Sequence, residues 1–221
     1  MIVQLSSERT MKINETFLSI QGEGPQSGQL TYFIRFSGCN LRCNYCDTKY
    51  AYYDGDEYTA DSIISKVASS GAKNVCITGG EPLLQKELDF LAKRLIDQGY
   101  NIDLETNGSL KLPQWTSDKQ VTVALDIKCL SSGMSQKMIF QNLRILRPKD
   151  FVKFVIASNQ DYEYAKKISR GISKAKIYFH PVFSEIEPRD LAEKIIRDKL
   201  INVTFGLQIH KYIWPLSKRG V

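Results

Sequence analysis

Short apolar runs that alternate with segments of helical period constrain the fold of this chain more than any other feature. The runs are rich in β-branched and aromatic residues, as strands are, and they span residues 32–36, 75–78, 102–105, 121–127, 152–156, 177–180 and 203–209. Strands that alternate with helices pair in parallel through right-handed crossovers. The pattern therefore predicts an α/β fold around a parallel sheet.

Three segments between these runs have the marks of helices. One begins at polar capping residues in 59–61, continues through Val67 and ends at Gly71. The other two carry apolar residues at helical spacing opposite charged ones, which predicts that each apolar stripe faces the core. The two stripes are Leu84, Leu88, Leu91 and Leu95, and Leu191, Ile195, Ile196 and Leu200.

The number of strand–helix units, about six, is smaller than the eight of a closed barrel. A chain of 221 residues also suits one domain with a single core. We therefore expect a single domain with a partial (β/α)6 TIM-like barrel over residues 31–210. Residues 1–30 are then a segment that caps the substrate site, and residues 211–221 are a tail.

Composition limits the location and the partners of the protein. No apolar run is long enough to cross a bilayer, and residues 1–12 lack the apolar stretch of a secretory signal. We therefore expect a cytoplasmic protein without membrane contact. The net charge of +6 is spread over segments of mixed sign, which is typical of a solvated surface and argues against direct nucleic-acid binding.

Three of the five cysteines, Cys39, Cys43 and Cys46, form a C-x3-C-x2-C pattern. Three thiolates on one short loop can bind three irons of a [4Fe-4S] cubane, which leaves the fourth iron free for another ligand. Structural zinc is the alternative, but it needs four closed ligands. Cys76 and Cys129 are isolated from this loop, and their surroundings favour small buried side chains.

The cysteine pattern, with the aromatic Tyr45 before its third cysteine, resembles the signature of the radical S-adenosylmethionine superfamily. The segment ITGGEP at 77–82 follows a strand and resembles the superfamily's Gly-Gly-Glu-Pro motif. The resemblance implies that S-adenosylmethionine chelates the open iron and, on reduction, yields a 5′-deoxyadenosyl radical. By motif position, it assigns the contacts with this cofactor to Tyr45, Cys46, Asp47, Gly80, Asp126, Ile127 and Lys128, with the loop 180–183 behind them.

Further segments resemble the 7-carboxy-7-deazaguanine synthase family. They are FLSIQGEG at 17–24, FIRF at 33–36, CDT at 46–48 and QIHKYIW at 208–214. That family converts 6-carboxy-5,6,7,8-tetrahydropterin into 7-carboxy-7-deazaguanine with release of ammonia, on the route to queuosine and archaeosine. The resemblance also implies hydrogen abstraction from C6 of the pterin, a homodimer, and an external electron donor of the flavodoxin or ferredoxin type.

The candidate substrate contacts suit a pterin with a carboxylate. Glu23 or Glu105 can accept two hydrogen bonds from the guanidine-like edge of the ring. Gln21 and Arg35 suit its other edge and its carboxylate, although Arg35 on a strand edge is also consistent with an ordinary surface cation. Motif position adds Ile20, Gly22, Thr78, His210 and Val221. The alternative for His210 is a place in the core, and Val221 reaches the site only if the tail folds back.

Thr48 is the candidate ligand for a metal ion. The resembling family uses the threonine after Cys-Asp to bind Mg²⁺, and in this chain that residue is Thr48. Mg²⁺ prefers oxygen ligands and keeps several waters, so the substrate would supply further oxygens. Without such a partner, a threonine hydroxyl usually makes a local hydrogen bond only.

Two other functions remain open at this point. One is a radical activase that forms a glycyl radical on a partner protein, but residues 21–24 and 46–48 argue against it. The other is a metal-bearing module that binds tRNA, which predicts a salt-dependent RNA affinity and no cleavage of S-adenosylmethionine.

Overall fold

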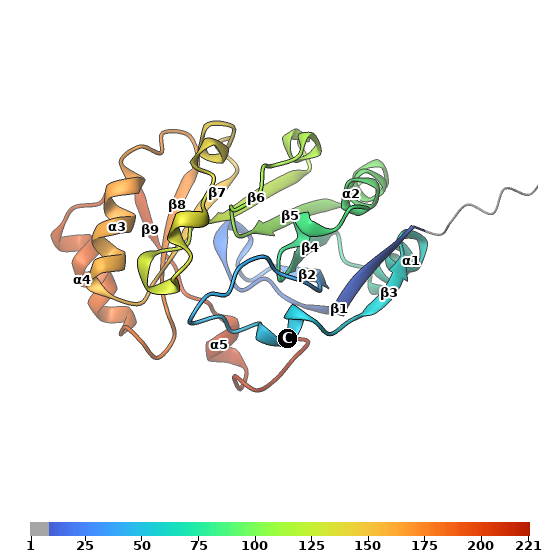
Figure 1. Ribbon diagram of the computed structural model, residues 1–221, viewed down its shortest axis with the longest axis horizontal. Coiled ribbons are helices and arrows are strands. Elements are labelled where there is room, and N and C mark those ends of the chain that lie inside the picture. The colour runs from blue at the N-terminus through green and yellow to red at the C-terminus, as the bar shows by residue number, and fades with distance from the viewer. Residues whose placement is uncertain (1–8) are drawn as a thin grey trace, which may run out of the picture.

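A nine-stranded sheet is the centre of the computed structural model, which describes residues 9–221 (Figure 1). Its order is β3-β1-β2-β4-β5-β6-β7-β8-β9. β1 is antiparallel to both of its neighbours, and the other adjacent strands pair in parallel. The strands are β1 (Thr10–Ile20), β2 (Leu30–Phe36), β3 (Asp56–Thr59), β4 (Asn74–Gly79), β5 (Asn101–Thr106), β6 (Val121–Asp126), β7 (Phe151–Ile156), β8 (Lys176–Pro181) and β9 (Val203–Phe205).

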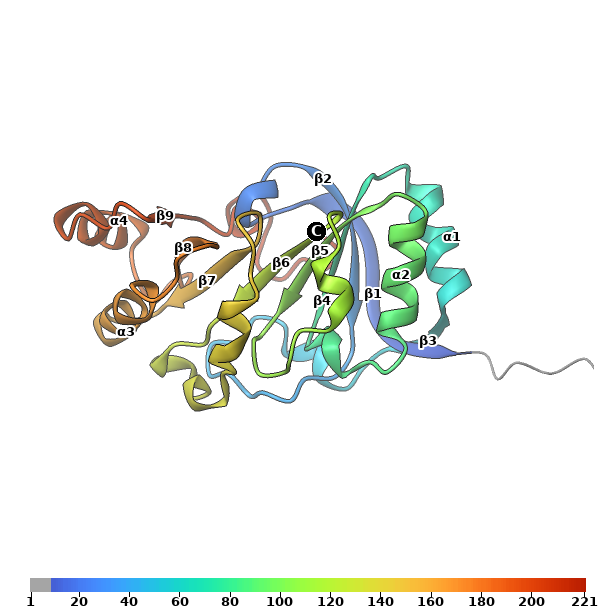
Figure 2. The same cartoon turned by 90° about the horizontal axis from the view of Figure 1, so that it is seen from above.

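The sheet curves into a partial barrel with α-helices on its outer side. α1 and α2 cover one half of the outer face, and α3 and α4 cover the other half (Figure 2). The predicted α/β fold with a mostly parallel sheet is thus confirmed, while β1 and β3 extend the sheet beyond the predicted barrel strands. The α-helices are α1 (Ala60–Ser70), α2 (Leu88–Asp97), α3 (Asn159–Ser169), α4 (Pro188–Arg197) and the short α5 (His210–Ile213).

The strand–helix repeat is irregular in the middle of the sheet. Between β5 and β7, the described chain forms 3₁₀ turns and no α-helix, because glycines and prolines such as Gly108, Pro113, Gly133 and Pro148 interrupt these connections. The 3₁₀ helices of the structure are Gly24–Gln26, Lys49–Tyr52, Pro82–Leu84, Gln114–Ser117, Leu130–Ser132, Ser135–Lys137 and Phe140–Arg144.

The predicted start and end of the first helix are confirmed. Thr59 caps α1, since its hydroxyl oxygen accepts a hydrogen bond from the Ser62 amide at 3.2 Å. Gly71 ends the helix with a φ of 72°, a left-handed conformation that glycine adopts without a steric penalty. Ile63 and Val67 of this helix are fully buried. Burying each such side chain stabilises the fold by about 1.5–3 kcal/mol.

The prediction that both apolar stripes face the core is only partly correct. Leu84 lies in a 3₁₀ turn, 41% exposed, because the chain breaks between this turn and the start of α2 at Leu88. In α4, Ile196 is 74% exposed, since it follows the buried Ile195 by 100° around the helix. Leu200 comes after the end of this helix and packs only at the border of the core.

The last predicted strand, 203–209, ends early at Phe205. At Gly206 the backbone passes so close to the His180 ring that a side chain would collide with it. Beyond this point the chain leaves the sheet and approaches the segment after β1, where the Ile209 amide donates to the Gly22 carbonyl at 3.1 Å. The residues after 205 therefore lie on the inner side of the barrel and do not extend the sheet.

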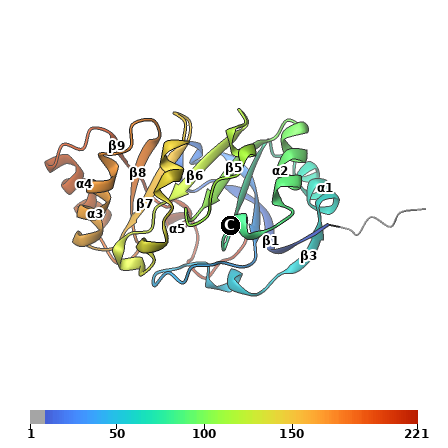
Figure 3. The same ribbon diagram turned by 45° about the horizontal axis from the view of Figure 1, so that its top comes forward.

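The curved sheet has α1 and α2 beside one half and α3 and α4 beside the other (Figure 3). Its inner face carries polar residues that line a cavity, and its outer face is apolar. The helices and the outer side of the sheet enclose the hydrophobic core. On the inner side, Arg35 of β2 lies opposite Thr78 of β4, and Asp126 of β6 lies opposite Lys153 of β7. Charged residues on a buried sheet cost free energy unless they are paired or bind a ligand, so this face is where a functional site is expected.

The segment after β1 crosses this inner face. Gln26 reaches β6 through a hydrogen bond of 3.3 Å to the Thr122 hydroxyl, and Glu23 reaches Lys153 of β7. Residues 1–8 of the predicted capping segment lie outside the described residues, and the division at 30 and 211 stays a prediction. Within residues 9–221, no helix combines the length and the apolar character needed to span a membrane.

Candidate active site

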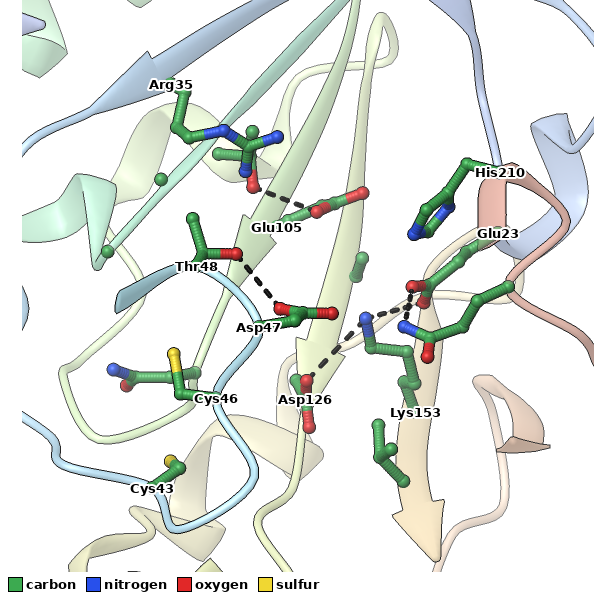
Figure 4. Close-up of a pocket in the computed structure, with 18 of the residues that line it drawn as sticks. Glu23, Arg35, Cys43, Cys46, Asp47, Thr48, Glu105, Asp126, Lys153 and His210 are labelled. Atoms are coloured by element: carbon green, nitrogen blue, oxygen red, sulfur yellow. Dashed lines mark hydrogen bonds and ion pairs between the residues drawn. The ribbon is translucent and has the colours of Figure 1, made fainter. Parts of the chain in front are cut away.

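A cavity of about 220 Å³ opens on the inner face of the barrel, where the cysteine loop, the ends of the inner strands and the tail meet (Figure 4). Ile127 is the predicted site residue that does not line it, because its side chain is fully buried in the core. The predicted residues that line it are Ile20, Gln21, Gly22, Glu23, Arg35, Cys39, Cys43, Tyr45, Cys46, Asp47, Thr48, Thr78, Gly80, Glu105, Asp126, Lys128, His210 and Val221.

The three cysteines of the loop face the cavity as free thiols. Burial raises the pKa of Cys43 to about 11 and also raises the pKa of Cys39, so these thiols need a bound cation to become thiolates. Within residues 9–221, no three His, Cys, Asp or Glu side chains converge on a point that suits a single metal ion. Three thiols on one loop of the cavity wall are the ligands that three irons of a cubane require.

Gly79, the last residue of β4, and Gly80 after it let the cysteine loop pack against this strand end. Gly79 has a φ of 143°, and a side chain on Gly80 would collide with the Gly38 carbonyl and with Cys39. The Glu81 amide then donates to the Gly38 carbonyl at 2.8 Å. Close backbone contact of this kind requires glycine.

Replacing Gly80 by alanine is therefore expected to displace the cysteine loop. We expect the variant to retain less than about a tenth of the wild-type iron after anaerobic reconstitution, because misplacing metal ligands costs ten- to hundredfold in affinity. Iron and sulfide assays measure this loss. Gly171→Ala is the matched control, since Gly171 does not line the cavity, its φ is not positive and an added Cβ would meet its nearest neighbour at an ordinary contact distance. Equal iron in both variants would contradict the role of this contact.

Sequence reasoning placed Glu81 and Asn107 in segments at strand ends but assigned them no role, and the structure shows that they hold the loop after β5 against the cysteine loop. The fully buried Glu81 carboxylate accepts hydrogen bonds from the Asn107 amide at 2.7 Å and from the Thr106 hydroxyl at 2.9 Å. The side-chain amide of Asn107 lies 3.8 Å from the Cys39 sulfur. The acid of the Gly-Gly-Glu-Pro segment therefore connects two cavity loops.

Polar side chains of β2, β4 and β5 form one part of the cavity wall. Thr78 donates its hydroxyl hydrogen to Glu105 at 2.9 Å, and the Gln21 side-chain amide lies 3.5 Å from the same carboxylate. The Arg35 guanidinium extends into the same space (Figure 4). A cation and a carboxylate thus lie close enough to contact two parts of one small ligand.

A second network, centred on Lys153, was not predicted. The Lys153 ammonium lies 2.6 Å from Glu23 and 3.6 Å from Asp126, and Gln208 donates to Glu23 at 2.6 Å. Although burial opposes it, the Lys153 ammonium holds the pKa of Glu23 well below its usual range. The one available signal is that Lys153 is the single charge in a strand whose other five residues are apolar.

The chain after β9 closes the cavity from the side of the cysteine loop. Lys211 forms an ion pair of 2.6 Å with Asp47, and the Thr48 hydroxyl donates to Asp47 at 3.0 Å. The tail folds back, which is the condition for Val221 to reach the site, and Val221 lines the cavity. His210 also lines it and lies against Gly22, so it does not belong to the core.

Only Val182 of the loop 180–183 lines the cavity. The His180 ring is 1% exposed, and neither of its nitrogens has a hydrogen-bond partner within the described chain. Burial lowers the pKa of His180 to about 4, so the ring is neutral near pH 7. Its position beside Gly206 makes it part of the wall behind the Lys153 network.

Asp103, beneath Glu105 on β5, gives the protein a predicted pH dependence. Burial, with a further effect of the Glu105 charge, raises the pKa of Asp103 from 3.8 to about 7. The folded state therefore holds a proton that the unfolded state has lost between about pH 4 and 7, so stability falls as the pH rises through this window.

We expect Asp103→Asn to remove this loss. Relative to the variant, the wild type should lose a few kcal/mol of unfolding free energy between pH 5 and pH 8, since one pKa unit corresponds to about 1.4 kcal/mol. Urea unfolding at both pH values measures it. Asp97→Asn, a change on an exposed helix end, is the control. Parallel pH profiles for the wild type and Asp103→Asn would contradict the prediction.

The proteins that this chain resembles are consistent with the candidate active site. The radical SAM superfamily model matches residues 33–153. The 7-carboxy-7-deazaguanine synthase of Clostridium acetobutylicum is 42% identical over 218 residues, which cover 95% of this chain and 99% of that protein. The enzyme of the same name from Chlorobaculum tepidum is 41% identical over 223 residues, which cover 98% and 100%.

A solved structure supports the fold. The crystal structure of QueE from Escherichia coli matches with a TM-score of 0.71 at 22% identity, over 90% of this chain and 92% of that one. The superfamily match spans the cysteine loop and the strands that line the cavity, and the two relatives match from end to end. This chain therefore belongs to the 7-carboxy-7-deazaguanine synthase family of radical S-adenosylmethionine enzymes.

Proposed function

We propose that this protein converts 6-carboxy-5,6,7,8-tetrahydropterin into 7-carboxy-7-deazaguanine and ammonia. One observation carries the proposal beyond the family name: Arg35 and the carboxylates Glu105 and Glu23 lie in the same cavity as the three thiols. The substrate has a carboxylate and a guanidine-like edge, which are the groups that an arginine and a glutamate bind in forked pairs.

The donor set of the cavity fits the cofactors of the superfamily. Cys39, Cys43 and Cys46 would hold the [4Fe-4S] cluster, and Tyr45, Asp47, Gly80, Asp126 and Lys128 would contact S-adenosylmethionine with the backbone of Ile127. When bound, these groups supply the radical that abstracts a hydrogen from the substrate. The protein itself would bind and orient the substrate and exclude water from the cavity.

The acidic side of the cavity would hold the ring of the pterin. Glu23 and Glu105 are the acceptors for its amino and ring N–H groups, with Gln21 and Thr78 beside Glu105. Lys153 keeps Glu23 ionised, so its carboxylate accepts without donating. Ile20, Gly22 and His210 would complete the wall around the ring.

Arg35 would bind the substrate carboxylate, with the Val221 end of the tail nearby. Thr48 would contribute one oxygen to a Mg²⁺ ion that the substrate also contacts, which suits a hard cation that keeps several waters. Asp47 accepts the hydrogen bond of the Thr48 hydroxyl at 3.0 Å and thereby orients its lone pairs. A divalent cation at this position would fix the substrate carboxylate relative to C6.

Two partners complete the proposal. Reduction of the cluster calls for an external electron donor, for which a flavodoxin or a ferredoxin is suited. The family resemblance further suggests a homodimer, which size-exclusion chromatography with light scattering tests directly. A cytoplasmic enzyme of this kind would feed the 7-deazapurine pathway to queuosine or archaeosine.

The test is an anaerobic assay of reconstituted protein with the carboxypterin, S-adenosylmethionine, Mg²⁺ and dithionite. We expect mass spectrometry to detect 7-carboxy-7-deazaguanine and ammonia. Cleavage of S-adenosylmethionine to 5′-deoxyadenosine without deazaguanine would favour the activase and overturn the proposal. Absence of both products, together with salt-dependent tRNA binding, would favour the tRNA-binding module. Omitting Mg²⁺ and adding a chelator is expected to lower the rate.

A further inference from the structure

Glu15 lies behind Arg35 on the neighbouring strand and has no role in the site described so far. The antiparallel register of β1 and β2 places the two residues opposite one another. The Glu15 carboxylate accepts a hydrogen bond from Arg35 Nε at 2.7 Å, and the two side chains are only 17% and 16% exposed. A largely buried charge pair with this contact has a fixed geometry.

We propose that Glu15 is a positioning residue, which directs the outer edge of the Arg35 guanidinium toward the carboxylate of the substrate. The C-terminal tail stabilises this arrangement of Glu15 and Arg35. The inference rests on the proposed function, because it names the residue behind the candidate carboxylate-binding cation.

The contacts of Arg35 leave its outer edge free for a ligand. Glu15 binds the inner Nε atom, and the Phe17 ring lies 5.8 Å from the guanidinium carbon. Within residues 9–221, neither terminal nitrogen of Arg35 donates a hydrogen bond to the protein. Figure 4 shows this end of the side chain directed into the cavity, on the side of Thr48 and Glu105. Two parallel N–H groups there match the geometry of a carboxylate.

A second contact holds Glu15 from the other side. The same Glu15 oxygen accepts the hydroxyl hydrogen of Tyr50 at 3.0 Å, just beyond the cysteine loop. The guanidinium of Arg219 covers the Tyr50 ring at 4.1 Å, which is a cation–π contact. Gly220 lies beside Phe17. The tail thus packs over the residues that hold Arg35 and stabilises their arrangement.

This arrangement holds the Arg35 guanidinium in one conformation before the substrate binds. An arginine side chain loses rotamer freedom when it is fixed, and a residue held before binding has already lost it. Removing Glu15 frees the guanidinium to adopt other rotamers. The cost should therefore appear in binding of the substrate carboxylate and leave S-adenosylmethionine binding unchanged.

Equilibrium binding tests this with a pair of ligands. Anaerobic calorimetry would compare 6-carboxytetrahydropterin with 6-methyltetrahydropterin, which lacks the carboxylate. For Glu15→Ala, we expect the Kd of the carboxypterin to rise about tenfold or more, as for loss of a good positioning contact, and the Kd of the methyl analogue to change less than twofold. Glu15→Gln keeps an acceptor oxygen and should recover part of the affinity. Arg219→Gln should show a smaller effect in the same direction.

The outcomes separate this inference from the proposed function. If the wild type does not bind the carboxypterin, the proposed function fails. If the wild type binds it and Glu15→Ala binds it equally well, the positioning role alone fails. An equal weakening of both ligands also overturns the positioning role, because it indicates a general structural effect. Glu57→Gln, an exposed change on β3, is the control, and thermal unfolding identifies any variant that is not folded.

Discussion

Cys43→Ala protein, reconstituted without oxygen, is expected to lose the iron-dependent absorbance of the wild type and all production of 5′-deoxyadenosine. Two thiolates cannot hold a cubane as three do, and no other cysteine of the described chain lines the cavity. The activity should fall by at least about 10³-fold, equivalent to more than 4 kcal/mol in the barrier, because the reaction cannot start without the cluster.

The matched control for this variant is Cys76→Ala. Cys76 is fully buried on β4 and packs inside the protein without lining the cavity. Its replacement removes one sulfur from the interior, at a cost of order 1 kcal/mol in stability, and we expect it to retain full iron content. Wild-type iron in Cys43→Ala, or loss of iron in Cys76→Ala, would show that the cluster is bound elsewhere.

Lys153→Met is expected to have the largest effect among the residues that sequence reasoning missed. Methionine fits the volume of the side chain but leaves the buried Glu23 carboxylate without its cation, while Asp126 keeps its ion pair with Lys128 at 2.9 Å. Breaking a buried pair from one side costs about 3–5 kcal/mol, which corresponds to roughly 10 °C in the unfolding midpoint of a protein of this size. Thermal and urea unfolding measure it.

A second substitution makes this prediction specific. In Lys153→Met with Glu23→Gln, the unpaired charge of Glu23 is gone, so part of the lost stability should return, while turnover of the carboxypterin stays low. Lys176→Met, on an exposed position of β8, is the control and should change stability little. The Lys153 network would lose its assigned role if the single variant unfolded like the wild type, or if the double variant showed additive losses.

The sequence predicts local features of this protein better than it predicts contacts between distant segments. Apolar runs and capping residues locate the parallel strands and α1, because these signals depend on neighbours in the chain. The cysteine loop is recognisable because its three cysteines stand within eight residues. The site residues on the ends of β2, β4, β5 and β6 follow from the rule that barrel loops gather at one edge.

The errors and omissions have a common physical cause. Lys153 pairs with Glu23 across 130 positions of the chain, and Lys211 pairs with Asp47 across 164. No periodicity records such partners, since they meet only after the sheet has curved. The early end of β9 depends in the same way on the His180 ring beside Gly206. Tertiary packing therefore decides where the last segment goes.

The measurement that tests the central claim most directly is electron paramagnetic resonance of the anaerobically reduced protein, with an iron count, before and after addition of S-adenosylmethionine. Three protein thiolates with one open iron predict about four irons per chain and a cluster signal that changes when the sulfonium compound binds. A zinc ion in place of iron, or a cluster signal that S-adenosylmethionine leaves unchanged, would contradict this account.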